Sequence, residues 1–310
     1  MIKKLYHFLV KNLPFKYSIL NFVAALPIKF KSEYILRITS NISQYCDPNY
    51  EVISNLGINN NLKIKIKIGN TIQAFGNPHL YISEISTLEL CSNLLKHVDC
   101  FLDIGSHIGY FCFYLENNNI NHTPIHFFEP DPDLFSNLQS NVNRNKLSNI
   151  YGSDLALSDK NGELTFFKNL NDSSSGSIKN TFNTIHKLKE IKVLTSTFDH
   201  YVENIPYNNY LLKVDVESAE FEFIRGAEKE LSRVRYLVIE LLQESIDLEF
   251  PLMMIEKYTF NAYYINNFEL YESKRGEYNY KDPYYNWLFT RDTKEELLTK
   301  LKGTKFKIKP

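Results

Sequence analysis

In FLDIGSHIGYFCFYL, residues 101–115, one aspartate and two glycines separate two apolar runs. The run before Asp103 predicts a buried strand, and the run after Gly109 predicts a helix. Gly105 allows a turn that a Cβ atom would obstruct, and Gly109 lets the helix approach the sheet or a ligand closely. Amides at the start of such a helix favour a negative group, so this unit is a candidate binding site.

Strands and helices alternate on both sides of this unit. Apolar runs predict strands at 99–104, 123–128, 149–155, 209–215 and 235–241, and helical spacing predicts helices at 84–97, 108–117, 131–145 and 217–232. Such a series predicts an α/β fold with a mostly parallel sheet and helices on both faces. Ligands of these sheets bind beyond the carboxyl ends of the strands, which restricts the candidate site residues to those ends.

The first 82 residues follow a different pattern and predict an N-terminal α+β extension to a domain at 83–310. The apolar run at 19–28 is too short to span a bilayer. We expect one or two amphipathic helices there, with a weak peripheral membrane contact through the N-terminus as the alternative. In LKIKIKIGNTIQAF, residues 62–75, alternating Lys and Ile predict a half-exposed strand in a hairpin with 71–75. The lysines then form a solvated face rather than a phosphate site.

The composition excludes several classes of protein. A net charge of -1 over 310 residues argues against a nucleic-acid partner, and 44% hydrophobic residues are typical of a soluble globular protein. No two of the four cysteines form a CxxC pair, and no histidine cluster has the spacing of a zinc site. Reduced, buried cysteines suit a reducing compartment, so we expect a cytoplasmic location.

Glu129 stands at the end of the strand predicted at 123–128, one strand after Asp103. A carboxylate at this position can accept hydrogen bonds from both hydroxyls of a ribose. The alternative is that Glu129 caps the following helix, with Pro130 and Pro132 shaping its first turn. The agreement in strand position with the glycine turn favours the ribose role.

Asp103 distinguishes between two kinds of nucleotide cofactor. The G-x-G-x-x-G motif of NAD enzymes is absent, and a carboxylate at Asp103 would repel a pyrophosphate. A carboxylate there suits a ligand with positive charge, such as the amino group of S-adenosylmethionine (SAM). An NAD-dependent dehydrogenase is therefore the weaker alternative.

Further carboxylates follow the last two predicted parallel strands. In LLKVDVESAE, residues 211–220, Asp215 ends an apolar strand, and Glu217 and Glu220 fall in the first turn after it. Glu240 ends the next strand at the same edge of the sheet. Acids in a first helical turn are common because of the helix dipole, but several converging on one sheet edge indicate a site.

These segments resemble the FkbM-type SAM-dependent methyltransferases. The resemblance runs from about Phe101 to Leu242 and rests on LDIGSHIGYF, FEPDPDLFSNLQSNV, ALSDKNGELTFF, TSTFDHYV and, most specifically, LKVDVESAEFEFIRGA. It implies a class I methyltransferase fold, Rossmann-like, with a seven-stranded mostly parallel sheet and an antiparallel C-terminal hairpin. It also implies methyl transfer from SAM to a hydroxyl, often on a sugar of a polysaccharide or glycosylated natural product.

The resemblance carries over to single positions. The residues that match the SAM-binding loop are Asp103, Gly105, Ser106, His107 and Gly109. Glu129 with Pro130 matches the ribose ligand, Asp154 with Ala156 the position that reads adenine, and Asp215, Glu217 and Glu220 the acidic block. The sequence departs from the family at Ser106-His107, usually Ala-Asn, and at Ser218, usually Gly. We expect the backbone of His107 rather than its imidazole to serve the site.

The expected chemistry is an in-line displacement that needs a base for the hydroxyl proton. We expect Asp215 or Glu217 to be that base, with Glu240 and Glu220 positioning the acceptor, a glycan or glycosylated small molecule. In a second version of the mechanism, Mg²⁺ held by Asp215 and Glu240 activates the hydroxyl. Alternatives are methylation of a small metabolite, RNA or protein, and a non-catalytic glycan-binding module that kept the fold. The polar segment 169–187 predicts a loop that could close over the acceptor.

Overall fold

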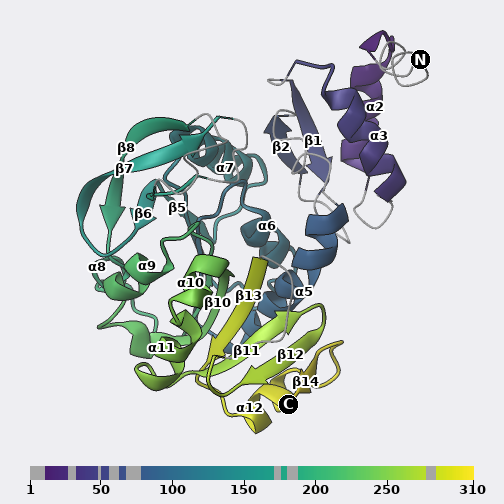
Figure 1. Ribbon diagram of the computed structural model, residues 1–310. Coiled ribbons are helices and arrows are strands. Elements are labelled where there is room, and N and C mark those ends of the chain that lie inside the picture. The colour runs from purple at the N-terminus through teal and green to yellow at the C-terminus, as the bar shows by residue number, and fades with distance from the viewer. Residues whose placement is uncertain are drawn as a thin grey trace. The chain divides into compact units, whose positions relative to one another are not determined.

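The computed structural model describes residues 11–26, 33–47, 50–55, 63–67, 78–170, 176–179, 188–276 and 284–310. The chain divides into two compact units, residues 1–84 with 137–147, and residues 85–136 with 148–310 (Figure 1). Because the first unit also includes residues 137–147, the domain boundary that the sequence suggests at 82/83 stays a prediction.

The smaller unit contains a two-stranded antiparallel sheet. Its N-terminal elements are α2 (Lys16–Ala25), α3 (Glu33–Ser43), β1 (Glu51–Asn55) and β2 (Lys63–Lys67). In β2, Ile64 and Ile66 are buried while Lys65 is half-exposed and forms an ion pair with Glu51, as the Lys/Ile alternation predicts. The strand that pairs with β2 is β1. The hairpin partner expected at 71–75 lies outside the described residues.

The larger unit is built on a nine-stranded sheet, in the order β14-β12-β11-β13-β10-β9-β3-β4-β5. The five strands from β10 to β5 are parallel, and β10, β13, β11 and β12 pair antiparallel. The strands are β3 (Cys100–Ile104), β4 (Ile125–Phe128), β5 (Ile150–Ser153), β9 (Tyr210–Val214), β10 (Val234–Leu242), β11 (Asn261–Asn266), β12 (Glu269–Ser273), β13 (Tyr284–Thr290) and β14 (Lys307–Lys309). The α/β class with a large mostly parallel sheet is thus confirmed, and β12 and β14 extend the expected seven strands at one edge.

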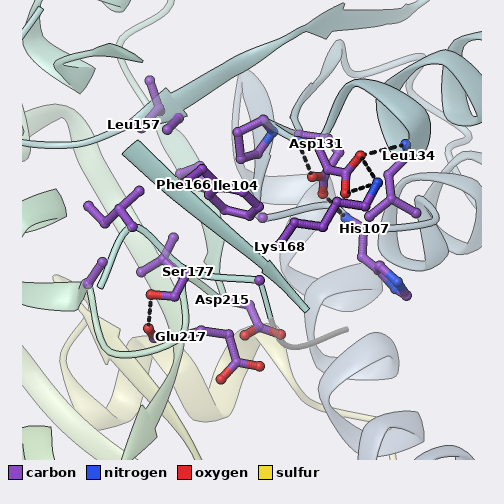
Figure 2. A pocket seen from close by; sticks show the side chains of 18 of the residues that line it. Ile104, His107, Asp131, Leu134, Leu157, Phe166, Lys168, Ser177, Asp215 and Glu217 are labelled. Atoms are coloured by element: carbon purple, nitrogen blue, oxygen red, sulfur yellow. Dashed lines mark hydrogen bonds and ion pairs between the residues drawn. The ribbon is translucent and has the colours of Figure 1, made fainter. Parts of the chain in front are cut away.

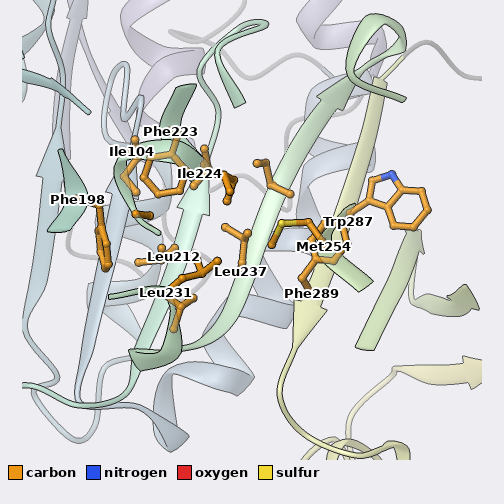
Figure 3. Close-up of a cluster of buried hydrophobic side chains, with 14 of the residues drawn as sticks. Ile104, Phe198, Leu212, Phe223, Ile224, Leu231, Leu237, Met254, Trp287 and Phe289 are labelled. Carbon is orange, nitrogen blue, oxygen red and sulfur yellow. The ribbon is translucent and has the colours of Figure 1, made fainter. Parts of the chain in front are cut away.

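Helices flank the sheet because its central strands are apolar on both faces. The helices from α5 on are α5 (Pro78–Leu94), α6 (Tyr110–Asn117), α7 (Pro132–Arg144), α8 (Phe198–Val202), α9 (Glu220–Gly226), α10 (Gln243–Asp247), α11 (Phe250–Glu256) and α12 (Lys294–Lys300). On one face, Phe198 of α8, Phe223 of α9 and Met254 of α11 pack against Leu212 and Leu237 of the sheet (Figure 3). This cluster holds the carboxyl ends of β3 and β9 in place for the site.

Aromatic residues of the C-terminal strands contribute to the core. Phe260, Tyr263, Trp287 and Phe289 are buried, and the rings of Trp287 and Phe289 stack with centroids 5.9 Å apart. These side chains therefore serve packing rather than a sugar-binding surface. Among the described residues, no helix is long and apolar enough to span a bilayer.

Two segments differ from the sequence-based expectation. The strand expected at 149–155 is interrupted at Asp154, and β6 (Leu155–Leu157) joins β7 (Gly162–Asn169) and β8 (Leu188–Ser196) in a separate three-stranded sheet. The helix expected from 217 begins only at Glu220, because Glu217 and Ser218 have φ values of 49° and 74°, which no right-handed helix accommodates.

Candidate functional site

A pocket opens at the carboxyl ends of β3, β4 and β9, with the small β6-β8-β7 sheet contributing to its wall. It encloses about 840 Å³ of empty space, part of which is open to solvent. Predicted site residues in the lining are Gly105, His107, Glu129, Pro130, Ala156, Asp215 and Glu217. Asp131 and Lys168 lie at one end of the pocket, and Asp215 and Glu217 lie at the other (Figure 2).

The turn after β3 requires glycine at position 105. Gly105 has a φ of 78°, and a Cβ atom there would lie 1.9 Å from the carbonyl oxygen of Asp215. The amides of Gly105 and Ser106 both donate to the carbonyl of Phe128, at 3.1 and 3.0 Å. The Ser106 hydroxyl donates to the carbonyl of Asp103 at 2.6 Å, so it fixes the turn and does not line the pocket.

Glu129 is buried at the end of β4 and accepts two backbone hydrogen bonds. The amide of His107 donates to Oε2 at 2.7 Å, and the amide of Asp131 donates to Oε1 at 2.8 Å. Burial raises the pKa of Glu129 to about 8, although both amide hydrogen bonds lower it. His107, with a φ of 52°, thus contributes its backbone to the site, whereas Gly109 is the buried N-cap of α6 and does not line the pocket.

A lysine from β7 joins this end of the pocket. The ammonium of Lys168 lies 2.8 Å from Asp131 and 2.6 Å from Asp133, and the Asp131 carboxylate also accepts from the amide of Asp133 at 2.9 Å. Asp131 therefore caps α7 while it ties β7 to the first turn of that helix. Neither Asp131 nor Lys168 was among the residues expected from the sequence.

Asp103 is buried and lies outside the pocket lining. Its Oδ2 accepts from the thiol of Cys112 at 3.1 Å. Burial raises the pKa of Asp103 to about 6, while the Cys112 hydrogen bond and the Lys213 ammonium lower it. Asp154, at the junction of β5 and β6, is exposed and also outside the lining. Direct contact of either carboxylate with a cofactor stays a prediction.

Asp215 and Glu217 follow β9 and line the other end of the pocket. The Asp215 side chain is 39% exposed, with the Lys213 ammonium 3.5 Å from its Oδ2. The hydroxyl of Ser177, from the connection between β7 and β8, donates to the carbonyl of Glu217 at 2.6 Å. This hydrogen bond stabilises the left-handed backbone of Glu217 and Ser218 at the pocket edge.

Glu220 and Glu240 do not line the pocket. Glu220 is buried and accepts from the amide of Ser218 at 3.0 Å and from the hydroxyl of Ser245 at 2.7 Å. Burial raises its pKa, and these hydrogen bonds lower it. Glu220 therefore supports the strained turn after Asp215 from within. Glu240 is half-buried in β10 and pairs with Asn286 of β13, so its contact with an acceptor stays a prediction.

A metal site of several ligands is not preformed in the described part of the chain, where no three His, Cys, Asp or Glu side chains are grouped to hold an ion. The Mg²⁺ site expected at Asp215 and Glu240 would have to be completed by water, and it stays a prediction.

The lining residues that were not predicted from the sequence come mainly from the small β6-β8-β7 sheet, Phe166 and Lys168 among them. Their signal was the alternation in GELTFFKN, which predicts a strand but not its position over the pocket.

Comparison with known proteins connects this geometry to one family. The family model described as Methyltransferase FkbM domain matches residues 103–281, more than half of the chain. Methyltransferase 1 of Beauveria bassiana is 24% identical over 217 residues, which cover 62% of this chain and 87% of that protein. Hexuronic acid methyltransferase AglP of Haloferax volcanii is 29% identical over 149 residues, covering 46% of this chain and 56% of that protein.

The crystal structure of methyltransferase FkbM from Methylobacillus flagellatus KT aligns with a TM-score of 0.43 at 13% identity, covering 91% of this chain and 59% of that chain.

Proposed function

Because the chain belongs to the FkbM methyltransferase family, we propose that it is a SAM-dependent O-methyltransferase that methylates a sugar hydroxyl. The observation that carries the proposal is one pocket with two different ends. At one end, buried Glu129 follows the second strand of the parallel series, and at the other end Asp215 and Glu217 are accessible.

The residues of the first end suit SAM. Carboxylate oxygens of Glu129 can accept from ribose hydroxyls, and the two backbone amides keep its orientation fixed. Apolar residues for an adenine ring are Leu134, Leu155, Ala156 and Phe166. The absence of a Cβ at position 105 leaves the β3 turn close to the Asp215 backbone. When bound, SAM supplies a methyl group on a sulfonium, which is electrophilic.

The residues of the second end suit proton removal and orientation of an acceptor. Asp215 or Glu217 takes the hydroxyl proton, since both carboxylates line the pocket. Glu220 keeps the turn that presents them in place, because it binds the Ser218 amide directly. This is a positioning role in place of the direct acceptor contact expected from the sequence.

A sugar acceptor is supported by the relative named hexuronic acid methyltransferase and by the net charge of -1, which disfavours RNA. Cytoplasmic location and glycan partners remain part of the proposal. Methylation of another metabolite or of protein is the second candidate, since the same pocket and base would serve any hydroxyl.

A transfer assay with methyl-labelled SAM tests the proposal. The acceptors are methyl glycosides of neutral hexoses and hexuronic acids, total RNA and a protein mixture, and label is expected on a sugar. Asp215→Asn with Glu217→Gln should lower transfer by about 100-fold, typical of losing a general base. Glu163→Gln, an exposed acid on β7 outside the pocket, is the control. Label on RNA or protein alone would contradict the sugar acceptor, and repeating the assay in EDTA separates the two versions of the mechanism.

A further inference from the structure

Lys213 is a buried cation in the central strand β9. Lys213 is 1% exposed. Among the residues that the structure describes, it is the only buried lysine or arginine. The other four residues of β9 are apolar and also buried. Because burying an ammonium is costly unless it is paired, a lysine at this position needs a specific reason.

Lys213 shares one face of the sheet with two carboxylates, those of Asp103 and Asp215. It is the register partner of Asp103 on β3, so the two side chains leave the sheet on the same face. Its neighbours Leu212 and Val214 point into the core on the opposite face. The ammonium lies 3.5 Å from Oδ2 of Asp215 and 5.2 Å from the ring centroid of Phe111 in α6.

The charges around Lys213 explain its burial. Asp103 is 2% exposed, and its pKa is raised by burial and by Asp215 but lowered by Lys213. Without a cation, two carboxylates at neighbouring strand ends would repel each other in a poorly solvated place. The ring of Phe111 adds a favourable face for the ammonium.

We propose that Lys213 is a positioning residue that serves as the resident cation of the Asp103–Asp215 pair, where it holds Asp215 at the pocket edge and excludes a divalent metal ion. This inference rests on the proposed function, in which Asp215 acts in methyl transfer, and it favours the version of the mechanism without Mg²⁺. An ammonium 3.5 Å from Oδ2 repels a second cation at the same carboxylate.

Binding of Mn²⁺, followed by electron paramagnetic resonance, tests the inference without an acceptor. The wild type is expected to leave Mn²⁺ free at millimolar concentration. Lys213→Met, which keeps most of the length of the side chain but removes its charge, should bind Mn²⁺ at least about tenfold more tightly. The gain should disappear in Lys213→Met/Asp215→Asn, and Lys213→Arg, which keeps the charge, should behave as the wild type.

Stoichiometric Mn²⁺ binding by the wild type that Asp215→Asn abolishes would overturn the inference, and so would a folded Lys213→Met that gains no affinity. If Lys213→Met does not fold, the wild type and Lys213→Arg still test the inference. Mn²⁺ bound at Asp215 in either protein would contradict the exclusion of a divalent ion by the charge at position 213. Lys192→Met, an exposed lysine on β8, is the matched control. SAM binding is measured in parallel, since its absence in the wild type contradicts the proposed function but leaves the Mn²⁺ result standing.

Discussion

The two ends of the pocket are built in opposite ways. At the Glu129 end the carboxylate is buried and both of its oxygens accept backbone amides, and Asp131 is paired with Lys168. At the Asp215 end the carboxylates are accessible, Asp215 directly before and Glu217 within a turn with positive φ at Glu217 and Ser218. The difference suggests that the first end is organised before a ligand binds, whereas the second keeps its geometry through supports such as Ser177 and Glu220.

The contact that joins the two ends should be the most sensitive to substitution. Gly105→Ala places a Cβ atom 1.9 Å from the carbonyl of Asp215, so we expect a loss of about 4 kcal/mol or more in the free energy of unfolding. The control is Gly303→Ala, where φ is 81° but no atom lies within 4 Å, and only about 1 kcal/mol of backbone strain is expected. Urea denaturation measures both, and equal losses would show that the close approach is unimportant.

Removal of the Lys168 cation should disturb the Glu129 end. Lys168→Met leaves the buried Asp131 carboxylate without its ion pair, which should cost about 2 to 3 kcal/mol of unfolding free energy. Lys192→Met, whose exposed ammonium donates to the hydroxyl of Thr165 at 3.1 Å, should change stability by less than about 0.5 kcal/mol. Thermal denaturation measures the stability of both variants. An unchanged stability in Lys168→Met would mean that Asp131 is held by the helix alone.

The raised pKa of Glu129 makes cofactor binding depend on pH. With a pKa of about 8 the free protein is mostly protonated at Glu129 at pH 7, while ribose hydroxyls donate better to the ionised form, so SAM should bind about tenfold more tightly at pH 9 than at pH 7. Titration calorimetry at several pH values measures this dependence. Glu129→Gln cannot ionise and should show only the titration of SAM itself, and a wild type with the same profile would contradict the prediction.

The strain at the Asp215 end predicts a small stabilising substitution. Ser218 has a φ of 74°, so Ser218→Gly should raise the free energy of unfolding by about 0.5 to 1 kcal/mol. Ser232, in the 3₁₀ turn Leu231–Arg233, is not among the residues with positive φ, and Ser232→Gly should instead lower stability by about 0.5 kcal/mol. Chemical denaturation measures both changes. A lower free energy of unfolding in both variants would show that the turn at Ser218 stores no strain.

The sequence predicts the scaffold of the site better than its walls. The apolar run before Asp103, the glycine turn and the strand that leads to Asp215 are local patterns, and the structure places them as expected. Glu129 could be assigned to a strand end because the carboxyl ends of parallel strands meet at one edge of a sheet.

Contacts between distant segments could not be predicted in this way. Lys168 and Ser177 reach the site only because β7 folds back over it, and their own neighbourhood in the sequence carries no sign of a ligand. Asp103 and Glu220 were expected at the ligand because of their positions in the sequence, and these contacts stay predictions. Position in the sequence does not determine where a side chain points, and in the structure both are buried and hydrogen-bonded within the protein.

Calorimetric titration of SAM at pH 9 into the wild type and Glu129→Ala, with Glu163→Ala as the matched control, decides whether Glu129 binds the cofactor. One SAM should bind per chain of the wild type and the control. Because Glu129, with a pKa of about 8, is mostly ionised at pH 9, Glu129→Ala should bind SAM at least about 30-fold more weakly, through the loss of two ribose hydrogen bonds to a charged acceptor. Equal SAM affinity in Glu129→Ala and the wild type, or binding of NAD in place of SAM, would contradict the assignment of this pocket to SAM.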